Sequence, residues 1–294
     1  MKTKAFIYII LAGVLWGTSG LFVHALAPYG FTTPQMSAVR AVVSFAGLAL
    51  FALIRDRSLF RIKPTELLLF AVIGASLFAT GTCYFTSMQL TSVATAVILM
   101  YTAPIYVAIY SMLFLGERFS RLKLAAIIGM LIGCALVAGV VGGMRFDAVG
   151  ILLGVCSGIA YAAYNILTKI AIRRGSRPAT ATLYSVLFMA LVALTVSQPQ
   201  HILTHASASP ALIIALMLAL GLVTHFIPYL LYATGMRDLP AGTASALGIV
   251  EPMAATLFGM WLLGDRLDVF SYIGIALILL ATLLLSRTEA LGKE

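Results

Sequence analysis

The stretch TAVILMYTAPIYVAIYSMLFLGERFSRLK at residues 95–123 has a counterpart 148 residues later, TASALGIVEPMAATLFGMWLLGDRLDVFS at residues 243–271. Both stretches are apolar, contain a central proline, and are followed by a glycine, an acidic residue and an arginine. The coinciding residues are Thr95 with Thr243, Ala96 with Ala244, Leu99 with Leu247, Pro104 with Pro252, and Leu115-Gly116 and Arg118 with Leu263-Gly264 and Arg266. Apolar segments share letters by chance, but prolines, glycines and charges rarely coincide at one offset. We therefore infer two related halves, residues 1–142 and 147–287.

The composition predicts an integral membrane protein. Of 294 residues, 62% are hydrophobic and 10% are charged, and the mean hydropathy is +1.06, a balance that a soluble domain could not cover with polar surface. Apolar runs of about 18 to 24 residues recur, each long enough to cross a hydrocarbon core of about 30 Å as a helix. We expect ten spans, at residues 5–26, 34–54, 66–88, 92–114, 123–142, 148–170, 180–197, 211–233, 241–263 and 269–286. We interpret the first as an uncleaved helix, because it is longer than the apolar core of a signal peptide.

The formal charge of +9 reflects membrane topology, and we expect no nucleic-acid partner. If the N-terminus is cytoplasmic, ten spans place sixteen Lys and Arg residues on the cytoplasmic side and only Arg145 and Arg266 outside, with Arg40 alone inside a span. The charges therefore predict cytoplasmic N- and C-termini, in what we take to be a bacterial inner membrane. The three cysteines lie within spans and have no metal-ligand spacing, so we expect no metal and no disulfide.

Each half contains five spans, an odd number, so the second half must enter the membrane from the side opposite to the first. Inverted repeats of this kind are typical of secondary transporters, whose substrate sites lie near the midplane between the halves. Pro104 and Pro252 interrupt corresponding spans, as expected of such a site. We predict alternating access by movement of one half against the other, with both prolines at hinges or gates.

The order of these motifs resembles the EamA branch of the drug/metabolite transporter superfamily. The resemblance rests on LWG at 15–17, Arg40 in MSAVRAVVSF, the proline and LGER of span 4, and EP and LGDR of span 9. It covers essentially the whole chain. It implies an all-α fold of ten transmembrane helices in two inverted five-helix repeats, with spans 1, 3, 4, 6, 8 and 9 around a central cavity. Proteins of this kind carry amino acids, nucleosides, sugars or quaternary amines, many of them outward.

Glu251 is the leading candidate for binding substrate, because an ionisable residue inside the membrane is costly and usually functional. Its counterpart in the first half is Ala103, so the carboxylate is not part of the shared scaffold. A stripe of small residues accompanies Glu251, namely Ala244, Gly248, Ala255 and Gly259. The stripe indicates either a close contact between helices or a cavity wall of small side chains that lets substrate reach Glu251.

Other polar and aromatic residues lie deep within the spans. Arg40 is expected to serve gating, to pair with Glu251 or with carbonyls of a broken helix, or to bind substrate. His225 and Tyr229 share one face of span 8 at helical spacing, and this face is read either as packing or as cavity lining. The predicted substrate-binding residues are Glu251, Trp16, Tyr84, Tyr101, Tyr161, Asn165, His225 and Tyr229.

We expect a secondary active transporter, an exporter or exchanger of a small organic metabolite, with amino acids as the first choice. A transporter of a choline-like or aromatic cation, held by Glu251 and an aromatic cage, is the alternative, as is an uncoupled facilitator. An intramembrane enzyme is disfavoured, since the sequence has no HExxH or G-x-S-x-G motif and no pair of intramembrane aspartates. We expect no cofactor, although Glu251 could carry a coupling proton. The partners are the solute and the bilayer, and the sequence leaves monomer and homodimer both open.

Overall fold

The computed structural model describes residues 2–117, 120–139, 147–206 and 209–291, and all regular structure within these ranges is helical. Nine helical segments of this described part are long and apolar enough to cross a membrane. They are α1–α2–η1 (Lys2–Tyr29), α3 (Thr33–Arg55), α4 (Pro64–Leu90), α5–α6 (Val93–Phe114), α8 (Ala148–Arg173), α9 (Pro178–Val196), α11–η4–α12 (Pro210–Asp238), α13–α14–η5 (Ala241–Leu263) and α15 (Val269–Thr288, within a helix that continues to Leu291).

The remaining predicted span is α7 (Arg121–Val137), whose 17 residues rise about 26 Å at 1.5 Å per residue, most of a hydrocarbon core. It runs along α15, and Gly133 and Gly274 bring the two backbones together: a Cβ on Gly133 would lie 2.8 Å from the Gly274 carbonyl. With α7 included, the structure confirms the predicted all-α fold of ten spans. Two short helices, η2 (Arg57–Phe60) and α10 (Pro199–Ala206), lie in connections.

Spans 4 and 9 are broken at corresponding points. Span 4 divides into α5 (Val93–Met100) and α6 (Ala103–Phe114), and span 9 into α13 (Ala241–Leu247), α14 (Val250–Phe258) and the π-helical segment η5 (Gly259–Leu263). Pro104 and Pro252 lie in the first turns of α6 and α14. Proline lacks the N–H that a continuous helix would need there, and its ring clashes with the preceding turn. The two breaks, at 101–102 and 248–249, fall within one residue of the 148-residue offset.

The halves interlock through reciprocal contacts. Span 1 of the first half packs on α12 and α14, and α8, its counterpart, packs on α4 and α5. Glycines allow both approaches: a Cβ on Gly17 would lie 2.8 Å from the Ala255 backbone nitrogen, and one on Gly158 would lie 2.6 Å from the Leu99 carbonyl. The small residues of spans 1 and 6 therefore serve close helix contacts.

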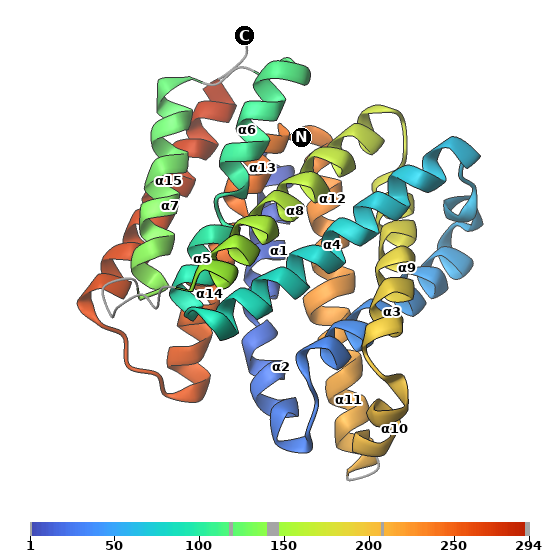
Figure 1. The fold of residues 1–294 in the computed structure, drawn as a ribbon. Helices are drawn as coiled ribbons and strands as arrows, with labels where there is room; N and C mark the ends of the chain where they lie inside the picture. Colours follow the sequence, from blue (N-terminus) through green and yellow to red (C-terminus); the bar gives the residue numbers. More distant parts are fainter. Residues whose placement is uncertain (1, 118–119, 140–146, 207–208, 292–294) are drawn as a thin grey trace.

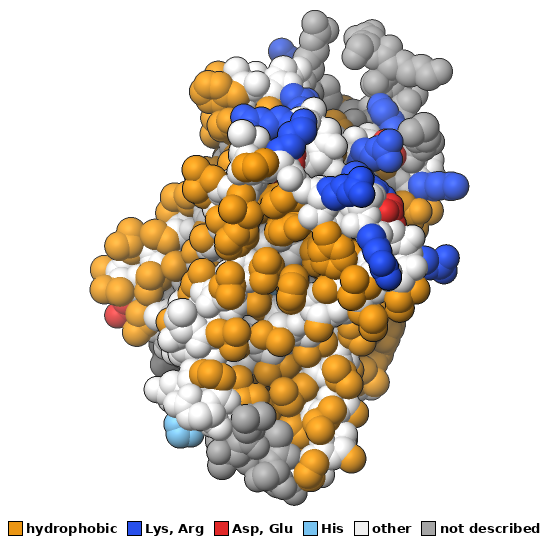
Figure 2. Space-filling view, turned by 90° about the vertical axis from the view of Figure 1, so that its right-hand side faces the viewer, with side chains coloured by type: hydrophobic (Ala, Val, Ile, Leu, Met, Phe, Trp, Pro, Cys, Tyr) orange, Lys and Arg blue, Asp and Glu red, His pale blue; other side chains and the backbone are white. Residues whose placement is uncertain are grey.

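Helix α1 begins, and α15 ends, at the same end of the bundle, which we call the terminal end (Figure 1). Figure 2 shows Lys and Arg side chains gathered toward this end and apolar side chains covering most of the flank below it. The opposite end is called the far end. Of the two predicted outer arginines, Arg266 follows η5, whereas Arg145 lies outside the described residues.

Candidate functional site

A cavity of about 410 Å³ lies between the two halves. This volume is within the usual range of small-molecule sites. The cavity reaches from the middle of the bundle to the far end, where it is lined by Thr33 and Val93, the first residues of α3 and α5. Val93 is 55% exposed, so the cavity meets the surface there.

Glu251 is positioned by the break in span 9. The break places its side chain in the first turn of α14, where the positive end of the helix dipole favours a carboxylate. The Tyr101 hydroxyl donates a hydrogen bond to Glu251 Oε2 at 2.8 Å and approaches the Gly248 carbonyl at 3.4 Å. Tyr101 comes from the break in span 4, so the broken helices of the two halves meet at this carboxylate.

Aromatic rings form one wall of the cavity. The Trp16 ring centroid lies 5.0 Å from that of Tyr229 and 5.2 Å from that of Tyr232. His225 stacks on Tyr229 at 4.3 Å, and Tyr164 meets Tyr229 edge-on at 5.6 Å. These contacts join spans 1, 6 and 8 and hold the rings in fixed orientations.

The structure separates the predicted site residues into two groups. The group that lines the cavity comprises Trp16, Arg40, Tyr84, Tyr161, His225, Tyr229 and Glu251. Tyr101 and Asn165 lie behind this wall: Tyr101 is 1% exposed and Asn165 is fully buried. The Asn165 amide donates to the Tyr161 carbonyl at 2.7 Å and accepts from the Tyr232 hydroxyl. Pro104 and Pro252 do not line the cavity.

Two features of the site escaped the sequence reasoning. Span 1 is broken between α1 (Lys2–Gly17) and α2 (Ser19–Leu26) without a proline; the Gly-Thr-Ser-Gly run at 17–20, with its low helix propensity, is the signal that could have indicated it. Span 8 contains the π-helical segment η4 (Leu222–Phe226), which carries His225. Pro228, two residues beyond η4, was the available hint, because it removes a backbone donor.

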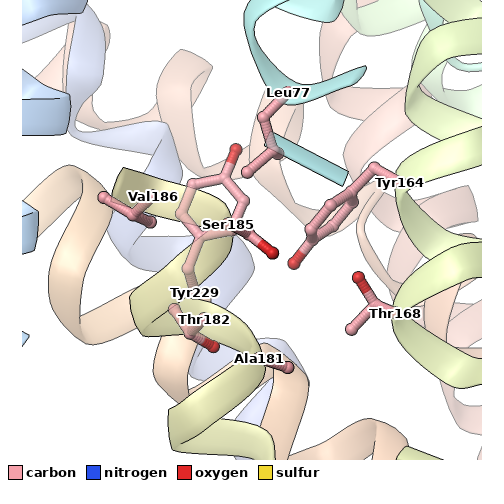
Figure 3. Close-up of a pocket in the computed structure, with 8 residues that line it drawn as sticks. All are labelled: Leu77, Tyr164, Thr168, Ala181, Thr182, Ser185, Val186 and Tyr229. Carbon is pink, nitrogen blue, oxygen red and sulfur yellow. The ribbon is translucent and has the colours of Figure 1, made fainter. Parts of the chain in front are cut away.

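A second, much smaller cavity of about 10 Å³ lies on the terminal side of the first. Leu77 and Tyr229 line both cavities and therefore form the wall between them. Figure 3 shows the oxygens of Tyr164, Thr168 and Ser185 directed into the small cavity. The Ser185 hydroxyl is buried without a hydrogen-bond partner among the described residues, and the space is about that of one water molecule.

Hydrogen bonds at the terminal end of the bundle hold helix ends of the second half, one of them from the first half. The Glu117 carboxylate accepts a hydrogen bond from the Ala241 N–H at 2.8 Å, at the start of α13. The Lys169 ammonium donates to the Met236 and Leu239 carbonyls at 2.5 and 2.6 Å, at the end of α12. These charge-assisted hydrogen bonds tie helix ends of the second half in place on the side away from the opening.

The EamA-like transporter family matches residues 3–139 and again residues 148–287. The chain belongs to this family. Among curated proteins, it is 27% identical over 292 residues to the uncharacterized transporter YwfM of Bacillus subtilis, covering 98% of this chain and 95% of that one. It is 32% identical over 280 residues to an uncharacterized transporter of Archaeoglobus fulgidus, covering 95% of each. A solved crystal structure superposes with a TM-score of 0.79 at 20% identity, covering 98% of this chain and 99% of the other, and shows the same fold.

Family membership and the fold together define a multi-pass integral membrane transporter of the EamA type. The names of these relatives specify transport but no substrate. In the part of the chain that the structure describes, no three His, Cys, Asp or Glu side chains come together as a metal site would require.

Proposed function

We propose that this EamA-family transporter moves a small amphoteric metabolite, an amino acid as first choice, as an exporter or exchanger working by alternating access. The observation that carries the proposal is a single carboxylate, Glu251, at the wall of an otherwise largely apolar and aromatic cavity that opens at one end. We infer that the terminal end is cytoplasmic and that the membrane is a bacterial inner membrane, from the charge bias. The cavity would then be open to the outside.

Glu251 is suited to bind a cationic group. A carboxylate inside a membrane protein is costly unless a partner compensates it. Its one hydrogen bond in the described structure, from Tyr101, orients the carboxylate but brings no positive charge. Arg40 attracts the carboxylate, but the ion pair found among the described residues joins Arg177 to Asp56. An ammonium entering from the cavity would bring a positive charge into direct contact with Glu251, while the faces of Trp16 and Tyr161 contribute cation–π attraction.

A quaternary or aromatic cation is the alternative substrate, because the same aromatic faces suit it. Arg40 argues against this alternative, since its positive charge lines the same cavity and would repel a ligand that is only cationic. An amphoteric solute can use both charges. We therefore rank an amino acid above a choline-like cation.

Glu251 would also serve coupling if substrate and proton compete for its carboxylate. Transport would then be driven by a proton gradient; an uncoupled facilitator would use the same site for binding alone. The proposed mechanism involves no cofactor. It needs no second protomer, because both halves of the site belong to one chain.

Counterflow in proteoliposomes tests the proposal. Purified protein is reconstituted with an unlabelled amino acid inside, and uptake of the same labelled amino acid is followed across a panel of amino acids, with choline in parallel. We expect at least one amino acid to accumulate transiently and Glu251→Gln to abolish this accumulation. Asp268→Asn, in an exposed carboxylate outside the cavity, is the matched control and should retain transport.

The outcomes separate the candidates. Accumulation of choline alone would replace the amino-acid proposal by the cation alternative. Unchanged accumulation in Glu251→Gln would remove Glu251 from substrate binding. Loss of pH-gradient-driven transport with counterflow intact would leave Glu251 as a coupling residue only.

A further inference from the structure

Arg40 and His225 line the cavity and carry buried nitrogens that have no hydrogen-bond partner among the described residues. His225 is 2% exposed, and neither of its ring nitrogens has a hydrogen-bond partner in the described structure. The Arg40 Nε is likewise buried and unpartnered, and the guanidinium makes one bond, from Nη2 to Ser37 Oγ at 3.2 Å. Both residues line the 410 Å³ cavity. Buried polar groups are satisfied in roughly 90% of cases, so this grouping needs an explanation.

The backbone that carries His225 is unusual in a way typical of functional sites. His225 belongs to the π-helical segment η4, which packs against α3, the helix of Arg40. Short π-helical insertions within α-helices occur often at functional sites. The ring is held against Tyr229, with centroids 4.3 Å apart, so the imidazole is positioned even though no hydrogen bond fixes it.

The internal repeat shows that these polar groups do not belong to the shared scaffold. At the offset of 148 residues the counterpart of His225 is Leu77. Pro34 and Pro178 lie in the first turns of α3 and α9, and aligning the two helices on these prolines makes Tyr184 the counterpart of Arg40. The Tyr184 hydroxyl donates a hydrogen bond to the Phe60 carbonyl. As with Glu251 and Ala103, the ionisable residue occurs in one half only. A scaffold role would be expected in both halves, whereas a substrate is bound once.

We propose that Arg40 and His225 form a carboxylate-binding subsite in the wall of the cavity where α3 contacts η4. This inference rests on the proposed function and specifies its substrate class. The guanidinium offers parallel N–H donors that fit a carboxylate, and a neutral imidazole adds one more. Arg40 and Glu251 come from different halves, on α3 and α14, and both line the cavity, where their opposite charges attract each other. The solute would place its negative group on Arg40 and its positive group on Glu251, with its apolar part over the aromatic rings.

Two minimal aromatic probes test the subsite separately from transport. Benzoate presents a carboxylate alone, and benzyltrimethylammonium presents a cation alone; binding is measured as the rise in melting temperature of the purified full chain with ligand concentration. We expect benzoate to stabilise the wild-type protein at millimolar concentrations. Arg40→Gln should weaken benzoate binding about 10- to 100-fold, the loss expected for hydrogen bonds to a charged group.

His225→Phe keeps the ring stacked on Tyr229 while removing the donor, and should weaken benzoate binding in the same direction. Benzyltrimethylammonium binding, which depends on Glu251, should persist in both variants and so shows that they are folded. Chloride at the same ionic strength controls for general salt effects.

The outcomes also distinguish this inference from the proposed function. Equal benzoate binding in wild-type and Arg40→Gln protein, or no benzoate binding at all, would overturn the subsite. If Glu251-dependent binding of benzyltrimethylammonium survives that result, the cationic pole remains and only the carboxylate pole falls. If neither probe binds, the cavity is not the solute site and both proposals fall together.

Discussion

The contact between span 1 and α14 sets the position of Glu251, and Gly17→Ala tests it. A Cβ on Gly17 would lie 2.7 Å from the Ala254 Cβ and 3.0 Å from the Glu251 carbonyl. Because carbon atoms pack best about 3.5–4.0 Å apart, α14 would have to move by about 1 Å. Overpacking of this kind costs about 1–3 kcal/mol. Gly20→Ala is the matched control for the melting temperature, since a Cβ there meets nothing within 4 Å; because Gly20 also lines the cavity, probe binding is compared with that of the wild type.

Both substitutions lie near the break in span 1, so the gain in helix propensity from alanine is similar and cancels in the comparison. At about 2–4 °C per kcal/mol for a protein of roughly this size, Gly17→Ala should melt about 2–12 °C below Gly20→Ala. The assay is thermal unfolding in detergent, followed by benzyltrimethylammonium binding, which should be weaker in Gly17→Ala than in the wild type because Glu251 is displaced. Equal melting temperatures with equal probe binding would refute the argument that this close approach positions the carboxylate.

Three further predictions follow from other contacts. Tyr101→Phe should weaken benzyltrimethylammonium binding about tenfold because Glu251 loses its orienting donor. The control Tyr106→Phe, at a hydroxyl without a hydrogen bond in the described structure, should leave this binding unchanged. Equal affinity of both variants for the probe would exclude the orienting role of Tyr101. In a background without the native cysteines, Ser185→Cys in the small cavity should react with an impermeant thiol reagent added on the cytoplasmic side. The reaction should be faster when substrate drives turnover. Labelling of this cysteine from the outside would contradict the prediction. Hydrogen bonds from Ser58 and Arg177 lower the pKa of Asp56 to about 2. The stabilising effect of the Asp56 carboxylate is therefore complete above its unfolded pKa of about 3.9 and is lost as pH falls through about 2. The melting temperature of Asp56→Asn should vary less with pH in this window than that of the wild type.

The membrane fold could be predicted from local composition. Ten apolar runs of spanning length have few other stable structures in a bilayer, because every backbone polar group must be satisfied within the segment, which helices achieve. The repeat followed from coincident prolines, glycines and charges, and the breaks near Pro104 and Pro252 followed from the chemistry of proline. The break in span 1 was missed because no proline marks it, although glycine and hydroxyl residues weaken the helix at that point.

The candidate site was predictable only in part. Helical spacing indicated that His225 and Tyr229 share a face, but periodicity does not say whether a face looks into a cavity or at a neighbouring helix. Inside a membrane protein both surroundings accept tyrosine and asparagine, so Asn165, fully buried behind the wall, has the same sequence pattern as residues that line the cavity. The partnership of Tyr101 with Glu251, 150 positions apart, has no local signal at all.

The sequence by itself determined that this protein lies in a membrane, how many spans it has, how these spans form two inverted halves, and that Glu251 has no counterpart in the first half. These properties depend on each residue's own polarity and on comparison along the chain. Only the tertiary structure decided which polar groups find partners: Tyr101 bonds Glu251, whereas the nitrogens of His225 and Nε of Arg40 are buried without a hydrogen-bond partner among the described residues. Whether a polar group on one helix finds a partner on another depends on the positions of the two backbones to within a few ångströms. Those positions follow from the packing of all ten spans together rather than from any one of them.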